Sequence, residues 1–265
     1  KALLEHGPNS FRGSAPHLNR LLAELQLEDA LVQPMVATKR YVYHKGRRWT
    51  FPSGLFGLLF SNLLSIRGRL RVFFEPFVRT LSKPNESVLD FFRRRIGAEA
   101  SDVFVGTFIR GIHATDASVI GVSDAFPQLV EMERRHRSLF SGFRRRPRPQ
   151  KTGIFAPKNG MGFITKTLAS KVDVRCDHRV DSIHRTDTGW TVSGSFNDIS
   201  ADKLILAVPA HQSAKLLSGV DADAVSVLSK VEHSHVVLVH EGGECAEKAP
   251  DGFGLLTSPQ TEMET

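Results

Sequence analysis

The sequence predicts a mixed α/β fold in which a helix-rich block interrupts an α/β framework. Three observations carry this prediction. Residues 35–148 are rich in Phe and Arg, and their apolar residues recur at helical spacing. After Lys151, short apolar runs alternate with helical patterns, which is typical of an open sheet covered by helices. The basic, proline-containing run RRRPRPQK, residues 144–151, separates the two as a linker.

Composition limits the class of protein. The 265 residues are 41% hydrophobic and 24% charged, which is enough apolar material for a core. A formal net charge of +7 favours anionic partners. Cys176 and Cys245 lack CxxC spacing, which argues against a disulfide framework or a zinc site. No run reaches the roughly 18–20 apolar residues that span a bilayer. The chain begins without Met and ends without a closing helix, as expected for the middle of a longer protein.

The first half of the chain predicts helices and one hairpin. Apolar residues at helical spacing predict an amphipathic helix over residues 17–31. The stretch TKRYVYHKGRRWTFPSG, residues 38–54, predicts a β-hairpin that turns at Lys45-Gly46. Residues 54–78 are apolar on nearly all sides, and they predict either a buried helix pair or an interfacial element.

The sequence SVLDFFRRRIG predicts a helix with Ser87 as N-cap, Asp90 at the capping-box position and Gly97 at the C-terminal end. The next segment predicts a helix that runs to about Arg110 and breaks at Gly111. Residues 126–146 predict a further helix that ends in a basic run.

The second half predicts α/β structure. A strand is expected at residues 153–157, a helix at 162–172 and a hairpin that turns at 187–189. Leu204 to Val208 reads as a buried strand that leads into a helix, and SHVVLVHEGG reads as a further strand.

Local motifs give little chemistry by themselves. Gly160-Met161-Gly162 reads G-x-G-x-x-T, lacks the last glycine of the dinucleotide fingerprint and is interpreted as a structural turn. No G-x-S-x-G elbow, catalytic triad or metal-ligand spacing is found. The arginine clusters at 93–95, 134–135 and 144–146 are interleaved with Phe at helical spacing, which favours a solvated face or a contact with anionic lipid over nucleic acid.

An ordered set of segments is similar to the flavin-dependent protoporphyrinogen oxidases, within the flavin amine oxidase superfamily. The resemblance covers nearly the whole chain. It rests on HGPNSFR, KRYVYHKGRRWTFPSG, SVLDFFRRRIGAE, FIRGIHATDASVIGVSDAFPQL, ERRHRSLFSG, NGMGFITKTLA, LILAVPA and GFGLL.

The resemblance implies the domain organisation. Residues 1–33 and 151–207 resemble parts of a Rossmann-like FAD-binding domain, interleaved with two other regions. Residues 34–150 resemble an α-helical, membrane-associating domain that lines the substrate site, and residues 208–265 resemble the start of a substrate-binding domain. Relatives carry a G-x-G-x-x-G strand and helix ahead of this region, so the resemblance also implies an internal fragment.

The resemblance further implies FAD-dependent oxidation of protoporphyrinogen IX to protoporphyrin IX in haem biosynthesis. Hydride passes to the flavin and electrons pass on to dioxygen, so no catalytic side chain and no metal is expected. Peripheral contact with an anionic membrane, bacterial cytoplasmic or mitochondrial inner, is implied without a transmembrane helix and without nucleic acid. The resemblance leaves room for a homodimer.

Five residues match substrate-binding positions of that family. Arg40 is expected to bind a propionate, because a guanidinium can hold a carboxylate with two hydrogen bonds. The backbone carbonyl of Gly111 is expected to accept a pyrrole N–H. Phe253, Leu255 and Leu256 are expected to contact the faces of the macrocycle.

Five further residues match cofactor-binding positions. Gly7, Pro8 and Asn9 are expected to pass beside the isoalloxazine ring, where glycine permits a close approach of the backbone. Val180 corresponds to a strand whose backbone meets the adenine, and Ala207 to an A-x-P turn near the cofactor.

Three alternatives remain open at this point. A coproporphyrinogen III oxidase of the same fold is favoured if extra basic groups line the pocket. Another member of the superfamily, an amine or carotenoid oxidase, requires an aromatic cage or a long apolar tunnel in place of Arg40. A non-enzymatic peripheral membrane protein that has lost FAD also explains the basic, Phe-rich block.

Overall fold

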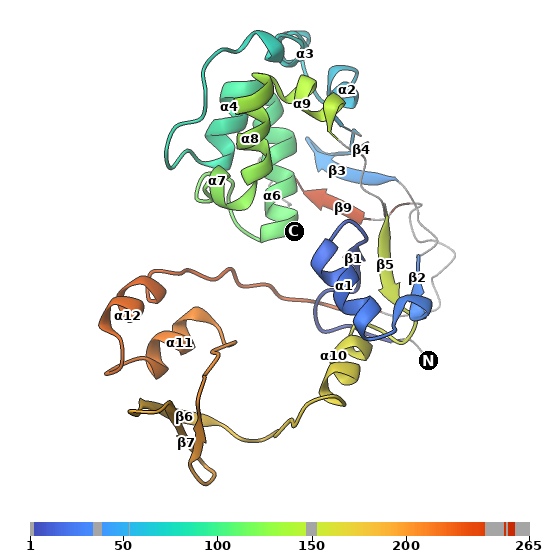
Figure 1. Cartoon of the computed structure of the whole chain (residues 1–265). Coiled ribbons are helices and arrows are strands. Elements are labelled where there is room, and N and C mark those ends of the chain that lie inside the picture. The colour runs from blue at the N-terminus through green and yellow to red at the C-terminus, as the bar shows by residue number, and fades with distance from the viewer. Residues whose placement is uncertain are drawn as a thin grey trace. The chain divides into compact units, whose positions relative to one another are not determined.

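The chain divides into two units in this computed structural model, which describes residues 3–33, 39–52, 54–146, 153–241, 252 and 254–257 (Figure 1). The first unit takes in residues 1–161 and 236–265, and the second takes in residues 162–235. Helices and strands are mixed in both, as predicted. The assignment of stretches to FAD-binding, helical and substrate domains stays a prediction.

One small sheet of the first unit joins segments that are far apart in the sequence. Its antiparallel order is β1 (Phe11–Arg12), β5 (Ile154–Pro157) and β2 (Leu31–Val32). Between β1 and β2 lie α1 (Pro16–Glu24) and the 3-10 turn η1 (Glu28–Ala30). The predicted helix over 17–31 is therefore too long, because the left-handed Gln26, with φ of 56°, ends it early.

The second sheet of this unit contains the predicted hairpin. β3 (Arg40–His44) and β4 (Arg47–Thr50) pair in antiparallel register, and Lys45 and Gly46 connect them with φ of 51° and 73°. Two positive φ values in a two-residue loop are those of a type I′ turn, which matches the twist of the strands. The hairpin is confirmed, with Thr38 and Ser53 outside the described residues. β9 (Gly254–Thr257) adds to the other edge of β3 in parallel.

The helical part of the first unit holds its main hydrophobic core, which is built from buried residues between Leu58 and Leu139. Residues from successive helices meet there, so burial of their apolar faces is the principal stabilising term. The helices are α2 (Gly54–Leu59), α3 (Ile66–Phe73), η2 (Glu75–Phe77), α4 (Val88–Ile96), α5 (Ala98–Ala100), the π-helical η3 (Ser101–Val105), α6 (Gly106–His113), α7 (Val122–Ala125), α8 (Pro127–His136) and α9 (Leu139–Arg145).

The caps predicted for α4 are confirmed. The Ser87 hydroxyl accepts a hydrogen bond from the Asp90 amide at 3.0 Å and donates one to the Asp90 carboxylate at 2.9 Å. Gly97 follows the helix with φ of 91°, a conformation that residues with a Cβ rarely adopt.

Two helix predictions are wrong. The helix does not break at Gly111, which lies inside α6; the left-handed residue that ends α6 is Ala114, with φ of 51°. The segment 126–146 forms two helices, because Arg137 adopts φ of 58° and Ser138 then caps α9 by accepting from the Ser141 amide. Glycine at position 111 therefore does not end the helix; it allows α6 to pack closely against Leu256.

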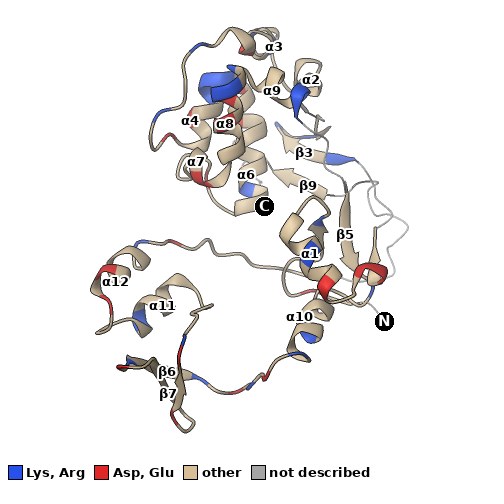
Figure 2. Cartoon of the chain, in the orientation of Figure 1, with Lys and Arg blue, Asp and Glu red and all other residues tan. Residues whose placement is uncertain are grey.

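The arginine run of α4 is partly buried, which corrects its interpretation as a solvated or lipid-facing cluster. Figure 2 shows basic residues gathered in this helical region. Arg95 is 0% exposed and forms an ion pair with Glu75, which is also fully buried. The Arg95 guanidinium donates to the Val78 carbonyl at 3.0 Å and to the Arg137 carbonyl at 2.9 Å. This one side chain therefore ties α4 to η2 and to the α8–α9 connection.

Arg94 extends the same network. It donates two hydrogen bonds to the Glu86 carboxylate, at 2.8 and 2.9 Å, and one to Glu133 at 2.6 Å. Burial acts to lower the pKa of Arg94, but the bonds to the two carboxylates outweigh burial and raise that pKa above its ordinary value. Arg93, by contrast, is exposed and pairs with Asp102 at 2.9 Å.

The second unit contains the predicted hairpin of β6 (Val180–Arg185) and β7 (Trp190–Gly194), with β8 (Ile199–Ala201) on the outer edge of β7. Its helices are α10 (Gly162–Ala169), α11 (Ala210–Leu216) and α12 (Ala222–Leu228). α11 packs near β6.

Two predicted strands are absent. Residues 204–208 in the second unit and 236–239 in the first form no strand, and Ile205 and Val237 are 89% and 87% exposed. A strand requires a neighbour for its N–H and C=O groups, and no described strand pairs with either segment. The apolar composition of these two segments was therefore not sufficient to predict a strand.

Candidate functional site

A cavity of about 240 Å³ lies in the first unit where the β3–β9 edge approaches α6. We call it the slot. The parallel register aligns Arg40 with Gly254 and Val42 with Leu256, so the start of β3 and the start of β9 form one wall. The slot is lined by Arg12, Arg40, Phe51, Phe108, Gly111, Ile112, Gly254, Leu255 and Leu256.

Arg40 is held at the slot by the hairpin. Its backbone carbonyl accepts a hydrogen bond from the Phe51 amide at 2.7 Å, which sets Phe51 beside it. On the same hairpin, the Arg48 guanidinium stacks on Tyr41, 4.6 Å from the ring centroid. At the turn end of β3, burial and then the charge of Lys45 lower the pKa of His44 below its ordinary value. A neutral His44 fits the buried side of the hairpin.

Gly111 brings the backbone of α6 close to the slot. A Cβ built at this position would lie 2.5 Å from the Leu256 side chain, so glycine permits the contact of α6 with β9. The Ala114 amide donates a hydrogen bond to the Arg110 carbonyl at the end of α6. The Gly111 carbonyl is the next one along the chain and belongs to the last turn of the helix. Terminal carbonyls of a helix are acceptors without an intrahelical partner.

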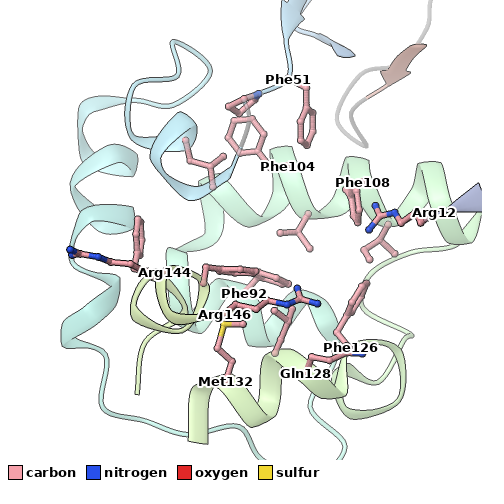
Figure 3. Close-up of a pocket in the computed structure, with 17 residues that line it drawn as sticks. Arg12, Phe51, Phe92, Phe104, Phe108, Phe126, Gln128, Met132, Arg144 and Arg146 are labelled. Carbon is pink, nitrogen blue, oxygen red and sulfur yellow. The ribbon is translucent and has the colours of Figure 1, made fainter. Parts of the chain in front are cut away.

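A second and larger cavity, of about 830 Å³, adjoins the slot (Figure 3). We call it the Phe cavity. It shares Arg12, Phe51 and Phe108 with the slot. Arg144, Arg146 and Gln128 are its other polar lining residues. Its walls are mostly aromatic and are formed by Phe51, Phe92, Phe104, Phe108, Phe126, Phe140 and Phe143.

Four of the five residues predicted for the substrate, Arg40, Gly111, Leu255 and Leu256, line the slot together. Phe253 lies outside the described residues. Leu255 is 53% exposed, whereas Leu256 is partly buried against Gly111. The roles given to these residues remain predictions.

The residues predicted for the cofactor lie in both units. Gly7, Pro8 and Asn9 form an exposed segment before β1. The preceding Glu5 holds this segment, because its carboxylate accepts a hydrogen bond from the Met161 amide at 2.7 Å. In the second unit, Val180 begins β6 and Ala207 is exposed ahead of α11.

Sequence reasoning missed Arg12, Phe51, Phe108 and Ile112 as cavity residues. Arg12 ends the segment HGPNSFR, yet nothing in that segment marks its side chain as facing a pocket. Phe51 follows β4 and Phe108 lies in α6, and only the fold brings these two parts of the chain together. Phe108 lies in a segment predicted to be helical, where an apolar residue of the core and one of a cavity wall follow the same spacing.

Within the described ranges, no group of three or more His, Cys, Asp or Glu side chains could hold a metal ion. Over the same residues, the helices are all too short or too polar to cross a bilayer.

Residues 2–240 match the family described as flavin containing amine oxidoreductase. The chain belongs to this family. Two of its relatives are the chloroplastic protoporphyrinogen oxidase 1 of Arabidopsis thaliana, 26% identical over 89% of this chain, and the human protoporphyrinogen oxidase, 28% identical over 98%. The coproporphyrinogen III oxidase of Bacillus subtilis is 28% identical over 98% of the chain. The predicted resemblance is therefore confirmed.

The chain spans only part of these relatives: 49% of the Arabidopsis enzyme and 60% of the human and Bacillus enzymes. Solved structures show the same fold. A protein from Exiguobacterium sp., provisionally named a protoporphyrinogen oxidase, superposes with a TM-score of 0.69 at 19% identity, covering 84% of this chain and 52% of that one. Cyclohexylamine oxidase from Brevibacterium oxydans gives 0.57 at 11% identity, covering 85% and 52%. The mixed α/β fold is that of the flavin amine oxidase superfamily.

Proposed function

We propose that the full-length protein is an FAD-dependent oxidoreductase that converts protoporphyrinogen IX to protoporphyrin IX, with dioxygen as the final electron acceptor. One observation carries the proposal. Arg40, Gly111, Leu255 and Leu256 match substrate-binding positions of the family that the sequence resembles, and all four line one cavity with apolar walls. The names of the Arabidopsis and human relatives support the same substrate.

In this proposal the chain binds and orients the macrocycle rather than attacking it. The Arg40 guanidinium binds a propionate, and a charge-assisted pair of hydrogen bonds fixes that edge of the substrate. The carbonyl of Gly111 accepts a pyrrole N–H. Phe51, Phe108 and Leu256 contact the flat faces and exclude water from the slot.

The segment Gly7–Asn9 fits a planar cofactor. It is exposed, and a Cβ built at Gly7 would meet no atom within 4 Å, so a ring can approach the backbone there. We propose that this segment borders the isoalloxazine ring, while Val180 and Ala207 serve the adenine side. When bound, FAD supplies the hydride acceptor of the reaction.

The test uses the full-length protein and both porphyrinogens side by side. We expect a flavin absorbance spectrum, porphyrin fluorescence that grows with time and oxygen uptake. A purified protein without flavin would instead support the non-enzymatic alternative. A flavoprotein that oxidises amines and neither porphyrinogen would overturn the substrate assignment.

Coproporphyrinogen III is the second candidate substrate, and one observation favours it. Beside Arg40, the slot and the Phe cavity are lined by Arg12, Arg144 and Arg146, and no described lining residue is acidic. Extra basic groups suit a substrate with four carboxylates, and the Bacillus relative carries that name. The same arginines disfavour a cationic amine as substrate.

We also propose that α3 and η2 bind peripherally to an anionic membrane. Their exposed apolar side chains recur at helical spacing, as Ile66, Leu70, Phe73, Phe74 and Phe77, next to the exposed Arg67. Phe60, which follows α2, is 81% exposed. Such a face inserts into the acyl boundary while arginine meets lipid phosphates.

Vesicle sedimentation tests the membrane proposal. We expect the full-length protein to bind vesicles of phosphatidylcholine and phosphatidylserine more tightly than phosphatidylcholine alone. Replacing Phe73 and Phe77 by Ser should weaken binding, whereas Val119→Ser, which removes an exposed apolar side chain elsewhere on the unit, should not. Equal binding by both variants would contradict the proposal.

A further inference from the structure

The Phe cavity contains cations to which the proposed function assigns no individual role. Figure 3 shows the guanidinium groups of Arg12 and Arg146 directed into the cavity from different sides, whereas that of Arg144 is directed away from it. No acidic side chain appears among the described residues that line this cavity. The cavity therefore combines aromatic walls with positive charge, which suits a flat, apolar anion.

Neither guanidinium has a partner among the residues that the structure describes. Within the described part of the chain, the side chains of Arg12 and Arg146 make no hydrogen bond and no ion pair. Both residues are exposed, so an incoming carboxylate can bind them without displacing a protein partner. This is the opposite of Arg94 and Arg95, whose guanidinium groups are held by glutamates.

Size connects the two cavities. The slot measures about 240 Å³. Pockets that enclose ligands of drug size hold about 300–1,000 Å³, so the slot alone is too small for a tetrapyrrole. The Phe cavity measures about 830 Å³ and shares Arg12, Phe51 and Phe108 with the slot. A macrocycle held by Arg40 in the slot must extend past these shared residues into the Phe cavity.

We propose that Arg12 and Arg146 form a second carboxylate-binding end of the substrate site. Arg146, which lines the Phe cavity and not the slot, binds a carboxylate on the edge of the macrocycle that faces away from Arg40. Arg12, which lines both cavities, binds a carboxylate where they meet. Together they favour a porphyrinogen with four carboxylates over one with two. A dicarboxylate porphyrinogen has both propionates on one edge and needs only Arg40. This inference rests on the proposed function and deepens it.

The experiment compares variants of the full-length flavoprotein with coproporphyrinogen III and protoporphyrinogen IX as substrates. Arg12→Ala and Arg146→Ala should each raise KM for the tetracarboxylate by about tenfold or more, the loss expected for a hydrogen-bonded charge pair. KM for the dicarboxylate should change by less than about twofold, within the range of a neutral substitution. The value of kcat and the flavin content should stay close to those of the unmodified protein.

Arg145→Ala is the matched control, because it removes the same charge from the adjacent position of α9 and does not line the Phe cavity. The conservative Arg12→Lys and Arg146→Lys variants should bind the tetracarboxylate more tightly than the alanine variants and less tightly than the unmodified protein. Lysine keeps the positive charge but cannot bind a carboxylate with two parallel hydrogen bonds as a guanidinium does.

Equal effects of Arg12→Ala on both substrates, or a loss of flavin, would overturn the proposal. So would Arg12→Ala and Arg146→Ala variants that behave like Arg145→Ala. In each of these cases porphyrinogen oxidation by the unmodified protein still stands. If the unmodified protein oxidises neither porphyrinogen, the proposed function itself fails.

Discussion

Two groups of arginines in the first unit show how the same side chain takes on different roles. Arg94 and Arg95 on α4 are surrounded by the carboxylates of Glu75, Glu86 and Glu133. Arg12 and Arg146 line the Phe cavity, where no described lining residue is acidic. A buried cation must have a partner from the protein, while a cation at a cavity can be satisfied by a ligand. An arginine paired with buried carboxylates therefore has a structural role, whereas an arginine at a cavity without acidic residues is suited to bind a ligand. A run of basic residues in the sequence does not distinguish the two.

The paired group should carry stability, and this gives the largest expected effect. Arg95→Met leaves the Glu75 carboxylate buried without its cation, which should lower the free energy of unfolding by about 3–5 kcal/mol. Urea denaturation followed by fluorescence measures it. Arg145→Ala, which removes an exposed cation, should change this free energy by less than about 0.5 kcal/mol. If Arg95→Met lowers the free energy of unfolding by less than about 1 kcal/mol, the paired arginines do not carry more stability than the exposed ones.

The arginine of the slot, Arg40, should carry binding instead. Arg40→Ala should raise KM for either porphyrinogen by about tenfold and change kcat less, because the lost interaction anchors the substrate before and during the reaction. Steady-state assays of porphyrin fluorescence measure both constants. Arg48→Ala removes a charge from the same hairpin but not from the slot, and its kinetics should be unchanged. Kinetics of Arg40→Ala equal to those of the control would end the anchor assignment.

The wall of the slot can be disturbed without touching a charge. In Gly111→Ala the new Cβ pushes against Leu256, 2.5 Å away, and should displace that side chain into the slot and raise KM. The change in unfolding free energy should be small. Alanine improves helix propensity by about 1 kcal/mol, which offsets part of the crowding. Adding Leu256→Val makes room for the new Cβ and should lower KM part of the way back to that of the unmodified protein. If KM does not fall, crowding against Leu256 is not the cause of its increase.

The smallest expected effect is a pH dependence of the hairpin that carries Arg40. Burial lowers the pKa of His44, so below its ordinary value of 6.5 the unfolded chain takes up a proton more readily than the folded one. The free energy of unfolding should therefore fall as the pH drops through that value. Urea denaturation at pH 7.5 and 5.5 measures the change, and His44→Gln should reduce it. The same slope in both proteins would exclude His44 as its source.

The local features that the sequence predicted correctly depend on neighbours along the chain. The hairpin needed only the alternation of residues 40–50 and the Lys45-Gly46 turn, and α4 needed only Ser87, Asp90 and Gly97. The family resemblance worked for a related reason, since the order of many segments carries more information than any one of them. The predicted substrate residues of the slot came from that resemblance, and the cavity walls Phe51 and Phe108 did not.

What the sequence by itself determined were the short-range turns and caps, the basic charge and membership of the flavin amine oxidase superfamily. Only the tertiary structure decided that Glu75 would neutralise Arg95, 20 positions away, and that Arg12 and Arg146 would face one cavity. It also decided that the apolar run 204–208 would remain unpaired. The physical reason is that capping and turn formation depend on a few adjacent residues. Ion pairing, cavity walls and strand pairing depend on which distant segments the folded core brings together.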